Sequence, residues 1–186
     1  VAKGTYNPLY SALDGARFGT NQLRNNTFLL VKNVKIYGGF AGTETTLADR
    51  DLSLVANKSI LSGDIGILND TSDNSHHVVS SVGDVENAIL NGFTITGGNA
   101  NHSSSYDVNT NNIGGRTGGG IVITNSSPTL KNISIINNYA LDTGGGIYSA
   151  TNSYPKLTNV VISENEAENN YGGGLANSSS SPIRTP

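Results

Sequence analysis

The sequence contains no cysteine, methionine or tryptophan, and only 13% of its 186 residues are charged. Without cysteine, the chain forms neither a disulfide nor a thiolate metal site. The net charge of -3 gives no electrostatic basis for binding nucleic acid or an anionic membrane surface. No apolar run approaches the ~20 residues of a membrane-spanning helix, so we expect no membrane span.

Glycine, by contrast, is abundant, with 23 residues, and much of it is periodic. Three glycine triplets begin at Gly118, Gly144 and Gly172, at nearly equal separations. Three prolines recur with the same period: Pro128, Pro155 and Pro182. Self-similarity with a period of about 27 residues is typical of solenoids, in which each repeat is one structural unit that packs on its neighbours.

A six-residue motif with apolar first, fourth and sixth positions recurs with the same period. Its copies begin at Val31, Leu90, Leu130 and Leu157, with a weaker copy at Leu61. The third position is always Asn or Gly, the residues that most readily adopt a left-handed backbone: Asn33, Gly63, Gly92, Asn132 and Asn159. Such a residue bends a strand without ending it, so that apolar residues on both sides face one interior.

A second short strand follows each glycine triplet, at residues 121–123, 147–149 and 175–177, and residues 77–80 occupy the equivalent place earlier. Stacked copies place each strand beside its counterpart in parallel, as expected for strands rich in Val, Ile and Leu. The pattern therefore predicts an all-β chain, a single-stranded parallel β-helix with about 27 residues per coil. No apolar stripe of helical period runs through the glycines, and the leucine ladder of a leucine-rich repeat is missing.

Three segments interrupt the repeat. Residues 7–26 show no strand pattern and are expected to form an irregular loop or cap. Residues 45–51 are expected to form a helical turn with Thr45 or Thr46 as its N-cap. Residues 99–117 form an insertion that lengthens one coil, since Leu130 follows Leu90 by clearly more than one period. Insertions of this kind usually emerge on one face of a solenoid and often bind ligands.

Residues 2–6, 34–44, 60–65 and 92–99 together resemble, in this order, the large secreted or surface β-helix proteins of Bacteroidetes-type bacteria. The later coils are similar to the repeats of polymorphic outer-membrane proteins. The resemblance covers nearly the whole chain, although the cysteine that often occurs in the later coils is missing. It implies a right-handed β-helix, secretion or display on the bacterial surface, and no enzyme activity: a stalk, scaffold or adhesin.

The resemblance also bears on the domain organisation. Residues 1–186 are expected to form one β-helix domain, an excerpt of a longer solenoid. Val1 would lie within a first strand, and residues 182–186 coincide with the start of another bent strand. We therefore expect further coils of the parent chain as neighbours.

The densest polar segment spans residues 64–77 and contains Asp64, Asp70 and Asp73. Calcium prefers oxygen ligands, so these three aspartates are candidate metal ligands. The alternative is an ordinary turn in which Asp and Asn cap their own backbone, and the spacing matches neither an EF-hand nor a nonapeptide calcium repeat. His76 and His77 would point to opposite faces of a strand, which favours a separate structural role for each. No other cofactor is expected.

Candidate catalytic residues are lacking in the repeats. Hydrolysis of a glycosidic bond needs two carboxylates ~5–10 Å apart, and the matched motifs contain no paired acids. The alternative function is a polysaccharide lyase or hydrolase whose site is incomplete in this sequence. The tyrosines offer surface for stacking against sugars: Tyr106, Tyr139, Tyr148, Tyr154 and Tyr171. Tyr139 and Tyr171 both precede glycine triplets, so they either share an edge or pack over that turn. The expected partners are carbohydrate or another surface protein.

Overall fold

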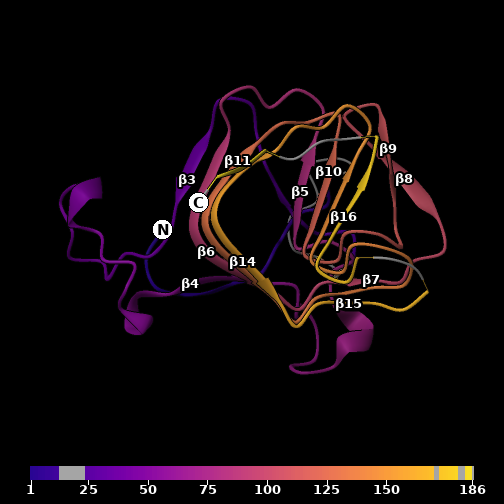
Figure 1. Ribbon diagram of the computed structural model, residues 1–186. Helices are drawn as coiled ribbons and strands as arrows, with labels where there is room; N and C mark the ends of the chain where they lie inside the picture. The colour runs from indigo at the N-terminus through magenta and orange to yellow at the C-terminus, as the bar shows by residue number, and fades with distance from the viewer. Residues whose placement is uncertain (13–23, 170–171, 180–182, 186) are drawn as a thin grey trace.

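The structure is a computed structural model that describes residues 1–12, 24–169, 172–179 and 183–185 (Figure 1). Its regular structure is almost entirely β, because the described helices are three short 3-10 turns: η1 (Leu47–Asp49), η2 (Val55–Asn57) and η3 (Thr71–Asp73). Three of the sheets are parallel throughout. The all-β, parallel class predicted from the sequence is therefore confirmed.

The first sheet holds the bent strands and has the order β1-β4-β6-β11-β14-β17, with β3 also pairing with β6. Its strands are β1 (Gly4–Tyr6), β3 (Lys35–Tyr37), β4 (Ser59–Ser62), β6 (Ile89–Thr96), β11 (Thr129–Ile136), β14 (Lys156–Ser163) and β17 (Ile183–Thr185). In Figure 1, β6, β11 and β14 follow one another as nested curved strands.

The second sheet lies across the molecule from these strands and has the order β16-β13-β10-β5-β2 (Figure 1). It comprises β2 (Phe28–Leu29), β5 (Val79–Val82), β10 (Ile121–Thr124), β13 (Ile147–Ala150) and β16 (Leu175–Ser178). The third sheet comprises β7 (Asn99–Ala100), β12 (Tyr139–Ala140) and β15 (Glu166–Ala167), with β12 in the middle. From β6 onward the chain visits the first, third and second sheets in that order and then repeats the sequence of visits.

The register of the bent strands matches the six-residue motif from β6 onward. Leu130 pairs with Leu90 and Leu157, and Ile135 pairs with Ile95 and Ile162. The residue at the bend has a positive φ in all three strands: 85° at Gly92, 53° at Asn132 and 50° at Asn159. The left-handed bend predicted for these three copies is confirmed.

The motif places its two upstream copies, at Val31 and Leu61, in the wrong register. Ile36 pairs with Leu90, so it occupies the first motif position, whereas Leu61 pairs with Ile95 and occupies the sixth. β3 and β4 thus supply two halves of one copy, and the chain makes an excursion over residues 38–58 between them. Val31 and Val34, which the motif placed in the interior, are 53% and 44% exposed.

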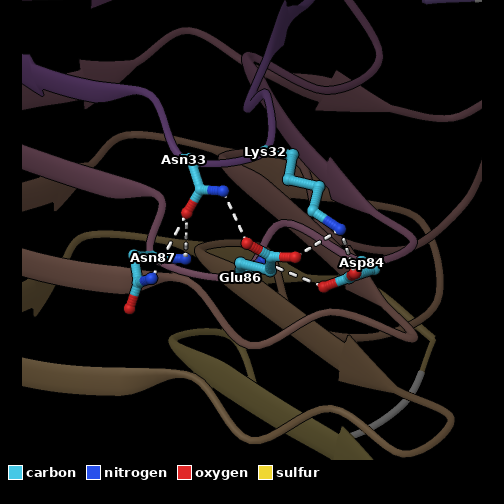
Figure 2. A network of polar contacts seen from close by, with 5 residues as sticks. All are labelled: Lys32, Asn33, Asp84, Glu86 and Asn87. Carbon is cyan, nitrogen blue, oxygen red and sulfur yellow. Dashed lines mark hydrogen bonds and ion pairs between the residues drawn. The ribbon is translucent and has the colours of Figure 1, made fainter.

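Asn33 and Gly63 do not occupy the bend that the motif assigned to them. Asn33 has a φ of 63°, but it lies in a surface turn beside Glu86 and Asn87, and Gly63 lacks a positive φ. Figure 2 shows this turn: Lys32 forms ion pairs with Asp84 and Glu86, Asn33 donates to Glu86, and Asn87 donates to Asn33. The left-handed Asn33 therefore serves a turn that docks on the turn before β6.

The main core lies between the first and second sheets, where Ile121 and Ile123 of β10 meet Leu130 and Ile135 of β11. Val122, between the two isoleucines, points the other way and is only 1% exposed. It packs in a second cluster under the antiparallel hairpin of β8 (Ser105–Val108) and β9 (Asn111–Gly114). This hairpin lies within the predicted insertion, and it covers the outer face of the second sheet.

The helical turn expected at residues 45–51 is confirmed as η1. A carboxylate oxygen of Asp49 accepts hydrogen bonds from the backbone of Thr45 (3.2 Å) and Thr46 (2.9 Å), and Thr46 is the N-cap. In the segment 7–26, Ser11 bridges Asn26, while residues 13–23 lie outside the described residues. Pro182 and Tyr171, named above, also lie outside them.

Candidate functional site

The carboxylates of the 64–77 loop cap their own backbone. Asp64 accepts from the backbone of Asn69 (3.0 Å), and Asp73 accepts from that of Ile67 (2.6 Å). Asp70 is the N-cap of η3 and accepts from the backbone of Ser72 (2.9 Å). Its hydrogen bonds with Ser72 lower the pKa of the Asp70 carboxyl. These contacts are the ones expected of an ordinary turn.

The calcium expectation for Asp64, Asp70 and Asp73 stays a prediction. Within the described part of the chain, no three His, Asp or Glu side chains form a group that could hold a metal ion. The second oxygens of Asp64 and Asp73 are buried and accept no hydrogen bond from the described residues. They are the buried carboxylate atoms of this loop that a cation could contact, and neither oxygen of Asp70 is of this kind.

His76 and His77 have different surroundings, and both are almost fully buried. The His76 ring lies 4.9 Å from that of His102, and its Nδ1 is 3.2 Å from the Asn99 carbonyl oxygen. His77 Nδ1 is 3.0 Å from the carbonyl oxygen of Gly118. Burial lowers the pKa of His76 to about 3, with a further contribution from Arg24, and lowers the pKa of His77 to about 4. Each imidazole is therefore neutral near pH 7 and has a structural role.

A polar hollow of about 410 Å³, which we call the Tyr139 groove, lies where η3 and its flanking loop meet the third sheet. Its lining combines amides, hydroxyls, a carboxylate and an aromatic ring: Thr71, Asn74, Gly97, Gly98, Asn99, Asn101, Asn137, Tyr139 and Glu166. Ligand sites are typically concave and combine a hydrophobic surface with a few convergent polar groups. The Tyr139 groove differs in having a mainly polar lining, in which the Tyr139 ring is the aromatic surface.

Tyr139 is centred in the groove by the register of the third sheet. It pairs with Asn99 on one side and Glu166 on the other, so that these three side chains lie in a row on one face. Its hydroxyl donates to the carboxylate of Glu168, the next residue on that face after Glu166. This hydrogen bond is the main cause that raises the pKa of Tyr139 to about 12. The phenol is thus held in one orientation with its ring partly exposed.

Side chains from distant segments fix the wall of the groove. Asn99 Nδ2 donates to the carbonyl oxygen of Thr71 in η3 (2.6 Å). Arg24 donates to the carbonyl oxygens of Asn74 (2.6 Å) and Asn99 (3.0 Å) and to the side chain of Asn101 (2.7 Å). The wall is therefore tied both to the third sheet and, through Arg24, to the residues that precede β2.

Two stacked asparagines support the corner beneath the groove. Asn138 is 2% exposed, and its Nδ2 donates to the carbonyl oxygens of Ile95 (3.1 Å) and Ile136 (3.0 Å). Its Oδ1 accepts from the backbone of Gly98 (2.9 Å), and Asn165 repeats this role one unit later by accepting from the backbone of Asn138 (3.0 Å). These amides, of which that of Asn138 is buried, satisfy the backbone at the corner beneath the groove.

A second hollow, of about 230 Å³, lies over the first sheet beside the excursion of residues 38–58. Leu52 and Leu54 form one side, and Asn132, Asn159 and Val161 form the other. Arg50 anchors the excursion, since its guanidinium lies over the rings of Tyr37 (5.7 Å) and Phe40 (5.6 Å). Its lining also includes polar side chains, among them Asp51, Asn57 and Lys58, but its aromatic residue, Phe93, is only 3% exposed.

The other tyrosines named from the sequence lie elsewhere. Tyr106 and Tyr148 pack against the second hydrophobic cluster, and burial raises the pKa of Tyr106. Tyr154 is 51% exposed in the turn between β13 and β14, and Tyr171 lies outside the described residues. Sequence reasoning missed Thr71, Asn99 and Asn101 as groove residues. They are common residue types with no spacing that marks them in the sequence, so only their proximity to Tyr139 distinguishes them.

Comparisons of the chain with protein-family models, curated proteins and solved structures found no match. Among the described residues, no helix is long and apolar enough to cross a membrane.

Proposed function

We propose that this chain is a non-catalytic, carbohydrate-binding segment of a right-handed parallel β-helix in a secreted or cell-surface bacterial protein, where it serves as a stalk, scaffold or adhesin. The helix would have about 27 residues per coil, which is the separation of the hydrogen-bonded Asn132 and Asn159. Two observations support this proposal: the chain visits three parallel sheets in a cyclic order, and its sequence has the resemblance described above. The proposal also accounts for the stacked asparagines, which recur one unit apart.

The observation that carries the binding function is the position of Tyr139 between Asn99 and Glu166 beside a polar hollow. An aromatic ring offers the apolar face on which a pyranose can stack. Amide and carboxylate groups offer the acceptors and donors that sugar hydroxyls need. The hydrogen bond from Tyr139 to Glu168 holds the ring in place before a ligand binds, which reduces the entropic cost of binding.

A glycan array followed by titration calorimetry tests this function. We expect Tyr139→Ala to weaken binding of the selected glycan about two- to tenfold, in line with the ~0.5–1.5 kcal/mol contributed by an aromatic contact. Tyr154→Ala is the matched control, because Tyr154 is also exposed but lies in a different turn. Equal losses in the two variants, or no glycan bound by the wild-type chain, would contradict the proposal.

No described contact favours the alternative function, a polysaccharide lyase or hydrolase. The two carboxylates at the groove, Glu166 and Glu168, are both exposed, and Glu168 accepts a hydrogen bond from Tyr139, so neither lies in the apolar surroundings that suit a general acid. Incubation with acidic and neutral polysaccharides distinguishes the two functions. The non-catalytic proposal predicts no new reducing ends and no unsaturated products, and the appearance of either would overturn it.

A further inference from the structure

The Tyr139 groove carries an acidic charge that its ligand must tolerate. Glu166 lines the groove, and Glu168 lies at the Tyr139 hydroxyl. Both carboxylates act electrostatically on that phenol and contribute to raising its pKa, and Arg116 opposes them as the last and smallest contribution. A bound sugar that stacks on the ring would therefore lie within reach of two negative charges.

The nearby cations are already engaged by the protein. The three groups that accept hydrogen bonds from Arg24 belong to the wall of the groove, and Arg116 pairs with Asp142 at 3.0 Å. The described residues that line the groove include neither Lys nor Arg. Proteins that recognise carboxylates or sulfates normally present an arginine or lysine to them.

We propose that the Tyr139 groove selects neutral glycans and discriminates against glycans that carry carboxylate or sulfate groups. This inference rests on the proposed carbohydrate-binding function and adds the class of ligand. Attraction would come from a sugar ring that stacks on Tyr139 and from sugar hydroxyls that donate to Glu166. Repulsion of acidic glycans would come from the charges of Glu166 and Glu168. Specificity in binding sites commonly combines one attractive and one repulsive element in this way.

The test uses probes that differ in charge on a common backbone. Fully methyl-esterified and de-esterified hexagalacturonides form the matched pair, and hexasaccharides of glucose, mannose and N-acetylglucosamine extend the neutral set. Affinities are measured by titration calorimetry at low salt, where repulsion between exposed charges is least screened. We expect binding of at least one neutral probe, and affinity for the de-esterified hexagalacturonide at least about tenfold weaker than for that neutral probe.

Two variants identify the source of the discrimination. Each of Glu166→Gln and Glu168→Gln removes one charge while keeping a similar shape, and each should improve binding of the acidic probe about fivefold relative to the neutral one, as expected for one charge pair near water. Glu164→Gln serves as the control, because Glu164 lies in the turn before β15 and does not line the groove. Circular dichroism spectra checked against the wild type confirm that each variant is folded.

The outcomes separate the two proposals. If none of the probes binds, the carbohydrate-binding function fails, and this inference fails with it. If the acidic probe binds as tightly as the neutral ones and the binding depends on Tyr139, the function stands and the selectivity is wrong. If Glu164→Gln changes the selectivity as much as Glu166→Gln, the discrimination comes from net charge and not from this groove, which also overturns the inference.

Discussion

Asn159 donates a 2.8 Å hydrogen bond from its side chain to Oδ1 of Asn132, the residue 27 positions earlier at the equivalent left-handed bend. Asn132 in turn donates to the side chain of Asn91 (3.0 Å), which also accepts from Arg50 (3.1 Å). One residue type thus meets two needs at the bend: it tolerates a positive φ, and its amide links neighbouring strands. Glycine, as at Gly92, meets only the first need.

The hydrogen bonds that link Asn91, Asn132 and Asn159 predict how substitutions at Asn132 rank in their effect on stability. Asn132→Ala should lower the free energy of unfolding by about 3–4 kcal/mol, because it removes two side-chain hydrogen bonds of ~1 kcal/mol each and places an alanine at a left-handed φ that costs ~1–2 kcal/mol. Asn132→Gly should cost less, since glycine relieves the backbone strain but not the loss of the bonds. Urea unfolding monitored by circular dichroism measures both. An alanine variant as stable as the glycine variant would show that the bend imposes no strain.

The hairpin predicts a second, separable contribution to stability. Ile113 is 1% exposed in the cluster beneath β8 and β9, so Ile113→Ala should destabilise the fold by ~2–4 kcal/mol. Val161→Ala is the control, because Val161 is 56% exposed and its truncation should change stability by less than ~0.5 kcal/mol. In the Ile113 variant, the rate of backbone amide hydrogen exchange should increase most at β8 and β9. Similar exchange in both variants would mean that the hairpin does not depend on this cluster.

The buried histidines predict loss of stability in acid. The pKa of His77 is about 4 in the folded chain, below its ordinary value of 6.5, so the unfolded chain binds the proton more tightly. The stabilisation that depends on neutral His77 is fully present above pH ~6.5 and is lost as the pH falls through ~4, with a total on the order of 3 kcal/mol. The low pKa of His76 acts in the same direction.

Thermal unfolding followed at a series of pH values, from about 7 down to about 4, measures this effect. His77→Asn keeps an amide that can donate to the Gly118 carbonyl oxygen but does not titrate, so it should reduce the slope of stability against pH. An unchanged slope in this variant would show that other groups cause the acid sensitivity.

The 64–77 loop predicts which aspartates respond to calcium. If the loop binds the ion, calcium at a concentration ~100-fold above its Kd should raise the free energy of unfolding by ~2.7 kcal/mol. Asp64→Asn and Asp73→Asn should abolish this gain, because their second oxygens accept no hydrogen bond from the described residues. Asp70→Asn should retain it, since neither oxygen of Asp70 is among the buried atoms without a hydrogen-bond partner in the described residues. Identical unfolding curves in calcium and in EDTA would refute the metal prediction.

Sequence reasoning succeeded where each repeat is uninterrupted. In β6, β11 and β14, the apolar positions and the left-handed bend lie one after another in the chain, so their spacing alone gives the register. It failed upstream, because one copy of the motif is divided between two strands. β3 pairs with the first half of β6 and β4 with its second half, while residues 38–58 leave the sheet between them. Val31 and Val34 imitate the apolar spacing of the motif, and Asn33 imitates its bend, although the three residues belong to a surface turn.

The sequence by itself determined the β class, the parallel pairing and the period of the repeat, because these follow from local apolar spacing and from residues that tolerate a left-handed backbone. Only the tertiary structure decided which segments complete the Tyr139 groove. Arg24, Thr71 and Asn99 reach it from segments that are far apart in the chain, and hydrogen bonds between them hold the wall in place. Such contacts join segments that are far apart in the chain, and no local pattern of residues encodes them.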